Sequence, residues 1–169
     1  MSKLDILKFP NKFLLKPTTP VEDIDGNLQR LIDDMAETMY AAPGVGLAAI
    51  QVGSDKRILV YDELPGEEKR QFQVFINPQL IESQGEIISE DEGCLSVPDF
   101  RSDVKRAARL LVEGVDREGM PLRLEADGFL AIVLQHEIDH LNGTLFIDRI
   151  STLKRELYKR RIKKLRKQK

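Results

Sequence analysis

The chain has 169 residues, of which 41% are hydrophobic and 32% charged, and its formal net charge at pH 7 is −2. This is the composition of an ordinary soluble domain with a hydrophobic core, and no run of about 18 apolar residues exists that could span a membrane. The N-terminus has no apolar block of signal-peptide length, and the single cysteine excludes an internal disulfide, so we expect a cytoplasmic protein.

The first predicted element is an amphipathic helix over residues 26–41. Asp25 can cap this helix, because aspartate is a favoured residue immediately before the first helical turn. Its apolar side chains follow the 3.6-residue period and are Leu28, Leu31, Ile32, Met35 and Met39. We expect the helix to end before Pro43-Gly44, since proline disfavours helical geometry in the residue that precedes it.

Short β-rich runs occupy the middle of the chain. The predicted strands are residues 57–61, 72–76, 80–88 and 109–115, followed by a turn within 116–120 and a returning strand at 122–124. Two helices follow, one over residues 127–141 that Gly143 is placed to end, and a last amphipathic helix from about Ser151. On that helix Leu153, Leu157, Ile162 and Leu165 form the predicted apolar stripe.

The order of these elements indicates the fold class. Because the strands are grouped between flanking helices and do not alternate with them, we predict an α+β fold with antiparallel sheets. We expect one domain, in which residues 1–150 carry the functional site and residues 151–169 form the C-terminal helix and tail.

The charge is distributed unevenly along the chain. Residues 154–169 contain ten Lys or Arg and one acid, a local charge of +9, so the rest of the chain carries −11. This contrast indicates an appendage that meets a polyanionic partner. A solvated helix that only aids solubility remains the alternative.

The strongest chemical signal is the sequence His136-Glu137-Ile138-Asp139-His140. Two histidines four residues apart lie on one face of a helix, so both imidazoles can bind one metal ion. Glu137 can then reach a water molecule on that ion. The motif alone does not identify the reaction, because several metalloprotease families share it.

A hydrolytic metal site needs a third protein ligand and one open position. Downstream of His140 there is no further His or Cys, and upstream the candidate is Cys94 within Glu-Gly-Cys-Leu-Ser. A thiolate is a strong ligand, whereas a lone cysteine is more often a small buried apolar residue. The residues alone leave both roles open.

A third segment, residues 44–51, reads Gly-Val-Gly-Leu-Ala-Ala-Ile-Gln. Its glycines and small residues indicate backbone that packs closely against another group, with Gln51 as the nearest strong side-chain donor. The glycines can also simply serve a turn.

Together and in this order, the three segments resemble the peptide deformylase family. That family is marked by GxGLAAxQ, EGCLS and QHExDHLxG, which stand here without a mismatch at residues 44–51, 92–96 and 135–143. The resemblance extends over essentially the whole chain. It implies an α+β fold in which a central metal-binding helix packs against antiparallel sheets. It also implies an enzyme that removes the formyl group from the N-terminal formylmethionine of new proteins and releases formate.

The resemblance also implies the roles of individual residues. Cys94, His136 and His140 would hold one divalent metal, and Glu137 would act as general acid and base. The side-chain amide of Gln51 and the backbone N–H of Leu95 would form the oxyanion hole. The substrate peptide would add as a strand along Val45 and Gly46 and near Gly93. The methionine pocket would include Val45, Phe129, Ile132, Val133 and His136, the first four of which can equally be core residues. We assign no pocket role to residues 89–91, which are more acidic than expected.

The metal and the partners follow from the same resemblance. It implies Fe²⁺, although the ligand types alone favour zinc, and oxidation beside a thiolate can leave Zn²⁺ or Ni²⁺ in isolated protein. We expect nascent formylmethionyl peptides as substrates and ribosome binding near the exit tunnel through the basic tail, with no membrane or DNA partner. The alternatives are a peptidase with an HExxH site and an RNA-binding module with a structural metal. The second would need a fourth ligand, and the chain has no further Cys or His.

Overall fold

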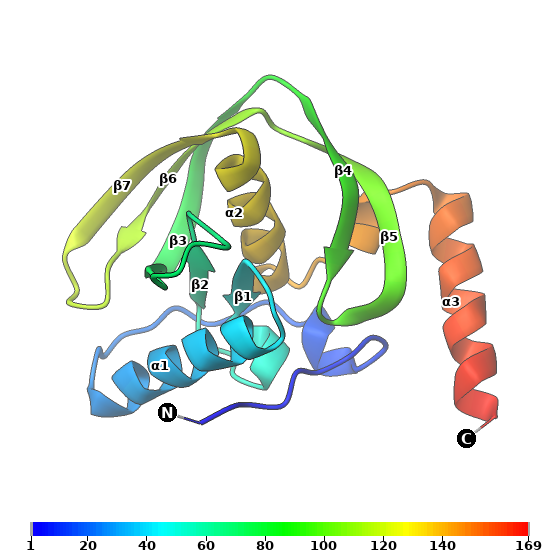
Figure 1. The fold of residues 1–169 in the computed structure, drawn as a ribbon, viewed down its shortest axis with the longest axis horizontal. Coiled ribbons are helices and arrows are strands. Elements are labelled where there is room, and N and C mark those ends of the chain that lie inside the picture. The colour runs from blue at the N-terminus through cyan, green and yellow to red at the C-terminus, as the bar shows by residue number, and fades with distance from the viewer. Residues whose placement is uncertain (1, 169) are drawn as a thin grey trace.

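The structure, a computed structural model, describes residues 2–168 and contains three α-helices and two antiparallel sheets (Figure 1). The α-helices are α1 (Gly26–Ala41), α2 (Gly128–Leu141) and α3 (Thr152–Lys167), and short 3-10 turns occupy η1 (Lys12–Leu15), η2 (Ala49–Val52) and η3 (Phe146–Arg149). The strands are β1 (Gly46–Ala48), β2 (Ile58–Asp62), β3 (Phe72–Gln84), β4 (Ile87–Cys94), β5 (Val97–Arg106), β6 (Arg109–Val115) and β7 (Pro121–Asp127). The larger sheet has the order β1-β2-β3-β6-β7, and β4 pairs with β5. The predicted α+β class with antiparallel sheets is confirmed.

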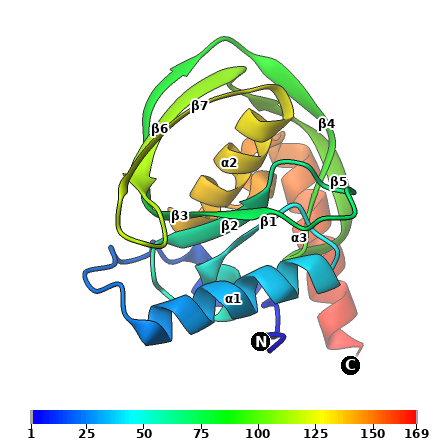
Figure 2. The ribbon, with the colours of Figure 1, turned by 60° about the vertical axis from the view of Figure 1, so that its left-hand side comes forward.

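Helix α2 lies at the centre of the molecule, with the curved five-stranded sheet on one side and the β4–β5 pair on the other (Figures 1 and 2). A helix that is apolar around most of its circumference must be covered on several sides. Ala131, Leu134 and Ile138 of α2 accordingly pack in one buried cluster with side chains of the sheet, including Leu59 and Phe75. This burial fixes α2 in the middle of the fold, and with it the residues of its last turns.

The five-stranded sheet is covered on both faces because its side chains alternate. Leu59 and Phe75 belong to the cluster with α2, whereas their neighbours Val60 and Val74 belong to a second cluster with α1. Helix α1 begins as predicted, with the Asp25 carboxylate accepting a hydrogen bond of 2.9 Å from the Leu28 N–H. Figure 2 shows α1 lying against the outer side of the sheet, opposite α2.

The strands differ from the prediction in the stretch from residue 72 to residue 106. The expected strand 80–88 is wrong, because β3 continues to Gln84 and the chain reverses at Gly85, whose φ of 70° suits glycine. β3 passes through Asn77-Pro78 by means of register shifts against β6, which explains why two strands were expected there. Strands β1 and β5 were not predicted. β1 has only three residues, and five of the ten residues of β5 are charged, which leaves no clear apolar alternation.

Helix α3 lies beside the β4–β5 pair and begins at Ser151, whose hydroxyl accepts a hydrogen bond of 3.2 Å from the Lys154 N–H (Figure 1). The predicted apolar stripe is only partly correct. Ile162 is buried together with Tyr158, but Leu153 is 70% exposed and Leu157 53% exposed. Tyr158 and Ile162 stand four residues apart and form the face that packs on the body. Among the described residues, no helix is both long and apolar enough to cross a membrane.

Candidate active site

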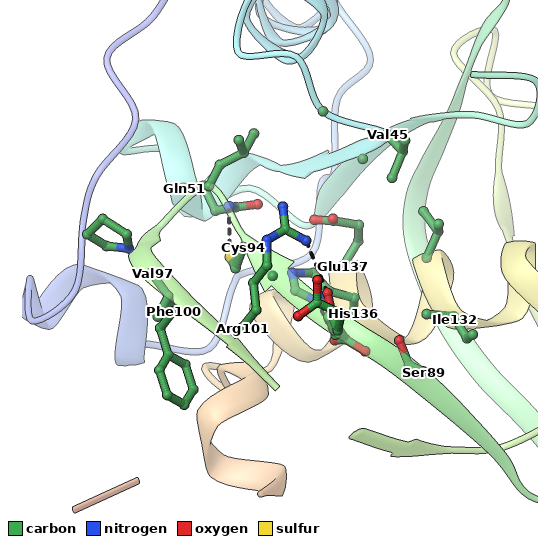
Figure 3. Close-up of a pocket in the computed structure, with 18 of the residues that line it drawn as sticks. Val45, Gln51, Ser89, Cys94, Val97, Phe100, Arg101, Ile132, His136 and Glu137 are labelled. Carbon is green, nitrogen blue, oxygen red and sulfur yellow. Dashed lines mark hydrogen bonds and ion pairs between the residues drawn. The ribbon is translucent and has the colours of Figure 1, made fainter. Parts of the chain in front are cut away.

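The three sequence motifs meet at one cavity of about 970 Å³, which lies between β1, the ends of β4 and β5, and α2 (Figure 3). Residues 43–46 and Gln51 line one side, residues 89–95 another, and α2 contributes Phe129, Ile132, Val133, His136 and Glu137. In Figure 3, Gln51, Cys94, His136 and Glu137 gather at the centre, while Val45 and Ile132 lie together to one side. Tertiary folding therefore brings together Gln51, Cys94 and His136, which follow one another in the chain at intervals of more than 40 positions.

Cys94, His136 and His140 present their donor atoms to one another. Cys94 ends β4 and the two histidines lie one turn apart on α2, so that the candidate ligand atoms all fall within 4.8 Å of one another. The Cys94 Sγ lies 3.2 Å from the His140 Nε2. One thiolate and two imidazole nitrogens form a donor set that suits Zn²⁺ or Fe²⁺, and three protein ligands leave a position open for water or substrate. The residues thus fit a single divalent metal.

Glu92 orients His136. The Nδ1 of His136 lies 2.7 Å from the Glu92 carboxylate, so this nitrogen donates to Glu92 and leaves Nε2 to face the other ligands. Glu92 is buried and its carboxylate also accepts hydrogen bonds of 2.5 and 3.2 Å from Arg106. A carboxylate behind a metal-binding histidine fixes the ring and makes it a stronger ligand.

Arg106 joins this carboxylate to the helix that carries the histidines. Its Nη1 donates to Asp139 over 2.7 Å, and Asp139 is paired in turn with Arg149 at 2.6 and 2.7 Å. The Arg106 side chain is 1% exposed, and its partners Glu92 and Asp139 are also shielded from water, whereas Arg149 lies 47% exposed at the edge of the network. The sequence analysis missed this network. Glu92 and Asp139 stand inside the recognised motifs, but Arg106 and Arg149 carry no local signal.

Burial and these ion pairs set the ionisation of the site. Burial opposes ionisation of Glu92, but hydrogen bonds from His136 and Arg106 outweigh it and lower the pKa of Glu92 to about 2. Because this pKa is below the ordinary value of 4.5, the stability that the ionised Glu92 contributes is present above pH 4.5 and is lost as the pH falls toward 2. Burial lowers the pKa of His140 well below its usual value, which favours the neutral imidazole that binds metals.

Glu137 lies against the backbone of β1. A Cβ atom on Gly46 would stand 2.8 Å from the Glu137 Oε1 and 2.9 Å from its Cγ, so only glycine allows the carboxylate to lie there. Burial raises the pKa of Glu137 to about 7. Its Oε2 is buried and has no hydrogen-bond partner among residues 2–168. A buried carboxyl with an unpaired oxygen beside the candidate metal ligands has the environment of a general acid and base.

Gln51 and residues 94–96 form a second polar group beside Cys94. The Gln51 Oε1 accepts a hydrogen bond of 3.0 Å from the Ala48 N–H, which turns the Nε2 end toward Ser96 Oγ at 3.1 Å and Cys94 Sγ at 3.8 Å. The Ser96 N–H also donates to Cys94 Sγ over 3.4 Å. Gln51 is therefore held with its donor end facing the candidate metal position. The sequence analysis missed Ser96, which stands within the EGCLS motif.

The remaining predicted residues line the same cavity, with different degrees of burial. Val133 is 5% exposed and packs in the core cluster of α2, whereas Phe129 is 54% exposed at the rim. Gly93 lies beside Arg101, whose side chain would come within 3.2 Å of a Cβ at that position. The structure also places residues in the cavity wall that the sequence analysis did not assign, namely Lys8, Ser89, Glu90, Asp91, Asp99, Phe100 and Arg101.

Replacing Arg106 by methionine is expected to lower the free energy of unfolding by about 3–5 kcal/mol, because Glu92 and Asp139 would stay buried without their partner. Calorimetric or denaturant unfolding measures this loss. The matched control is Arg123→Met, which removes an exposed pair with Glu113 at 2.9 Å and should cost about 1 kcal/mol or less. Equal effects of the two substitutions would contradict the structural role given to the buried network.

The chain is similar to known proteins of one family in both sequence and structure. A family model described as polypeptide deformylase matches residues 3–156. A peptide deformylase of Desulfosudis oleivorans is 61% identical over 168 residues, which cover 99% of this chain and 97% of that protein. One of Thermodesulfovibrio yellowstonii is 52% identical over 163 residues, 96% and 98% of the two chains. The crystal structure of a peptide deformylase from Legionella pneumophila superposes with a TM-score of 0.89 at 44% identity, covering 99% of each chain.

Proposed function

The chain belongs to the polypeptide deformylase family, whose members remove the formyl group from N-terminal formylmethionine, and we propose that it does so with the cavity residues described above. The single observation that carries this assignment of residues is the convergence of Cys94, His136 and His140, with their donor atoms within 4.8 Å of one another, beside the buried carboxyl of Glu137.

In this proposal Cys94, His136 and His140 hold one divalent metal. When bound there, the cation supplies Lewis acidity and lowers the pKa of water in the site. We propose Fe²⁺ in the cell, on the strength of the family resemblance, with Zn²⁺ or Ni²⁺ as substitutes in isolated protein. Metal analysis of protein purified without oxygen and in air tests this choice.

Glu137 moves the protons of the reaction. Its unpaired oxygen accepts the proton of the attacking water and then delivers that proton to the departing amine. Burial favours this double role, because a carboxyl whose pKa is raised to about 7 exchanges a proton readily near neutral pH. Gly46 keeps the carboxylate in place, since a larger residue would displace it.

Gln51 and Leu95 stabilise the charge that develops on the formyl oxygen. The Nε2 of Gln51 is already turned toward the site by the hydrogen bond of its Oε1 to Ala48, and the Leu95 N–H follows Cys94 directly in the chain. Donors fixed before the reaction cost no reorganisation when the oxyanion forms.

The peptide substrate would lie between β1 and β4. Both are edge strands, since β1 ends the five-stranded sheet and β4, within residues 2–168, pairs only with β5. An extended peptide can therefore pair with Val45 and Gly46 and reach Gly93. The methionine side chain would enter the part of the cavity lined by Val45, Phe129, Ile132 and Val133. Formate release from formyl-Met-Ala-Ser, with the same peptide unformylated as control, tests the function. Cleavage of a peptide bond in the control would support a peptidase instead.

We also propose that the protein works in the cytoplasm as one domain and meets ribosomes through α3. Burial of Tyr158 and Ile162 in a cluster with Val97 and Phe146 supports treating residues 151–169 as part of the same domain as residues 1–150. The outer turns of α3 are exposed and basic, so they offer cations to the phosphates of ribosomal RNA.

Replacing Lys163, Lys164, Arg166 and Lys167 together by glutamine is expected to weaken co-sedimentation with ribosomes several-fold at low salt, with a flatter salt dependence. Turnover of a short formylmethionyl peptide should not change. Point substitutions are preferable to truncation after Arg160, because truncation would remove the buried Ile162. The control replaces the exposed cations Lys3, Lys12, Lys56 and Lys105 of the body. If the two variants co-sediment with ribosomes equally across a salt series, the basic tail does not bind ribosomes and serves only solubility.

A further inference from the structure

Residues 7–9 of the N-terminal segment contact both residues that we assign to the oxyanion hole. The Leu7 N–H donates to the carbonyl of Gln51 over 2.7 Å, and the Phe9 N–H donates to the carbonyl of Ser96 over the same distance. Between them, the Lys8 ammonium donates to the carbonyl of Leu95 over 2.7 Å. A single short segment thus connects η2, which carries Gln51, to the turn that follows Cys94.

This segment is itself held in place. Leu7 and Phe9 pack against the buried cluster of Val97, Phe146 and their neighbours, which Cys94 also contacts. The Phe9 ring lies 5.7 Å from the ring of Tyr158 on α3. Lys8 differs from its neighbours because its side chain lines the active-site cavity. Because Leu7 and Phe9 are anchored on either side of it, Lys8 is held with its ammonium group at the Leu95 carbonyl.

The Leu95 carbonyl belongs to a peptide group that is held at both ends. Its oxygen accepts from Lys8, and its nitrogen, the Ser96 N–H, donates to the Cys94 Sγ over 3.4 Å. The Leu95 N–H belongs to the preceding peptide group, which is joined to this one through the Leu95 Cα. Because the planar group on one side of that atom is held at both ends, less rotation is left at Leu95 to change the direction of its N–H. The Lys8 ammonium also polarises the Leu95 carbonyl. This polarisation strengthens the hydrogen bond that the Ser96 N–H, at the other end of the same peptide group, donates to the Cys94 Sγ.

We propose that Lys8 is a positioning residue of the oxyanion hole, which acts through the peptide group between Leu95 and Ser96. This inference rests on the proposed role of Leu95 and deepens it. The ammonium sets the orientation of the Leu95 N–H before the substrate arrives, and the electrostatic stabilisation of an oxyanion depends on such preorganisation. The effect belongs to the transition state, because the charge on the formyl oxygen develops only there.

The test compares Lys8→Met, Lys8→Arg and Lys12→Met in the metal-loaded full-length enzyme. Lys8→Met is expected to lower kcat for formyl-Met-Ala-Ser about tenfold while KM changes by less than about twofold, the pattern of an interaction lost only in the transition state. Lys8→Arg keeps a cationic donor and should restore kcat to within about threefold of the wild type. Lys12→Met removes an exposed lysine from the same N-terminal region and should leave both constants unchanged.

The outcomes separate positioning from other roles. Unchanged kcat in Lys8→Met overturns the inference, as does a loss that appears only in KM, since Lys8 would then merely bind the peptide. A loss that accompanies a lowered Tm and that arginine does not restore also overturns it, because Lys8 would then only anchor the segment. A wild type that releases no formate overturns the proposed function and this inference with it.

Discussion

Glu137→Ala is expected to lower formate release by at least about 100-fold while the metal stays bound, since loss of a general acid and base typically costs that much or more. Glu137 is not among the three candidate ligands, and its buried carboxyl instead lies against Gly46. The measurement pairs single-substrate kinetics with the metal content per chain. We expect kcat to fall and KM to change little, because the proton transfers occur after the peptide has bound.

Two further substitutions sharpen this experiment. Glu137→Gln keeps the size of the side chain beside Gly46 but cannot accept a proton, so its turnover should be as low as that of the alanine variant. Glu118→Ala removes an exposed glutamate on the turn after β6 and should be as active as the wild type. Near-normal turnover of Glu137→Gln at full metal occupancy would remove Glu137 from the mechanism.

Cys94→Ala is expected to abolish or severely weaken metal binding, and formate release should disappear with the metal. Cys94 provides the only thiolate in the chain, and two histidines four residues apart on one helix do not complete a three-ligand site. The metal content after gel filtration in the presence of a weak chelator measures the loss. Cys94→Ser offers an oxygen in place of sulfur and should retain some metal with low activity.

The control for the cysteine variants is Ser102→Ala, which removes another small polar side chain from the β4–β5 pair. Ser102 is buried, and among the contacts of residues 2–168 its hydroxyl hydrogen-bonds only to the carbonyl of Asp103, so loss of this hydroxyl should leave the metal content unchanged. An unchanged metal content in Cys94→Ala would show that the proposed ligand set is wrong. If Cys94→Ala has lost its metal, addition of excess Zn²⁺ or Fe²⁺ distinguishes weakened binding from complete loss.

The elements that could be predicted from the sequence are those whose signals are local. Asp25 caps its helix as expected, and the last helix begins at Ser151 as expected, because an N-cap bond joins residues only three apart in the chain. The spacing of His136 and His140 places both rings on one helical face by geometry alone, and their centroids lie 5.0 Å apart. The grouping of the strands between flanking helices predicted the α+β fold, and the motifs containing Gln51 and Cys94 indicated a family that implies the same fold.

Tertiary structure alone decided what depends on distant partners. β5 escaped prediction because half of its residues are charged, and its buried Arg106 finds its partners Glu92 and Asp139 only in the folded structure. Lys8 appeared to be an ordinary terminal lysine, although it contacts Leu95, which is 87 positions later in the chain. Local sequence encodes caps and periodicity, which act over a few residues. The ion pairs of a buried charge such as Arg106, and a contact such as that of Lys8 with Leu95, depend on which surfaces pack together. These surfaces meet only when α2 is enclosed between the two sheets.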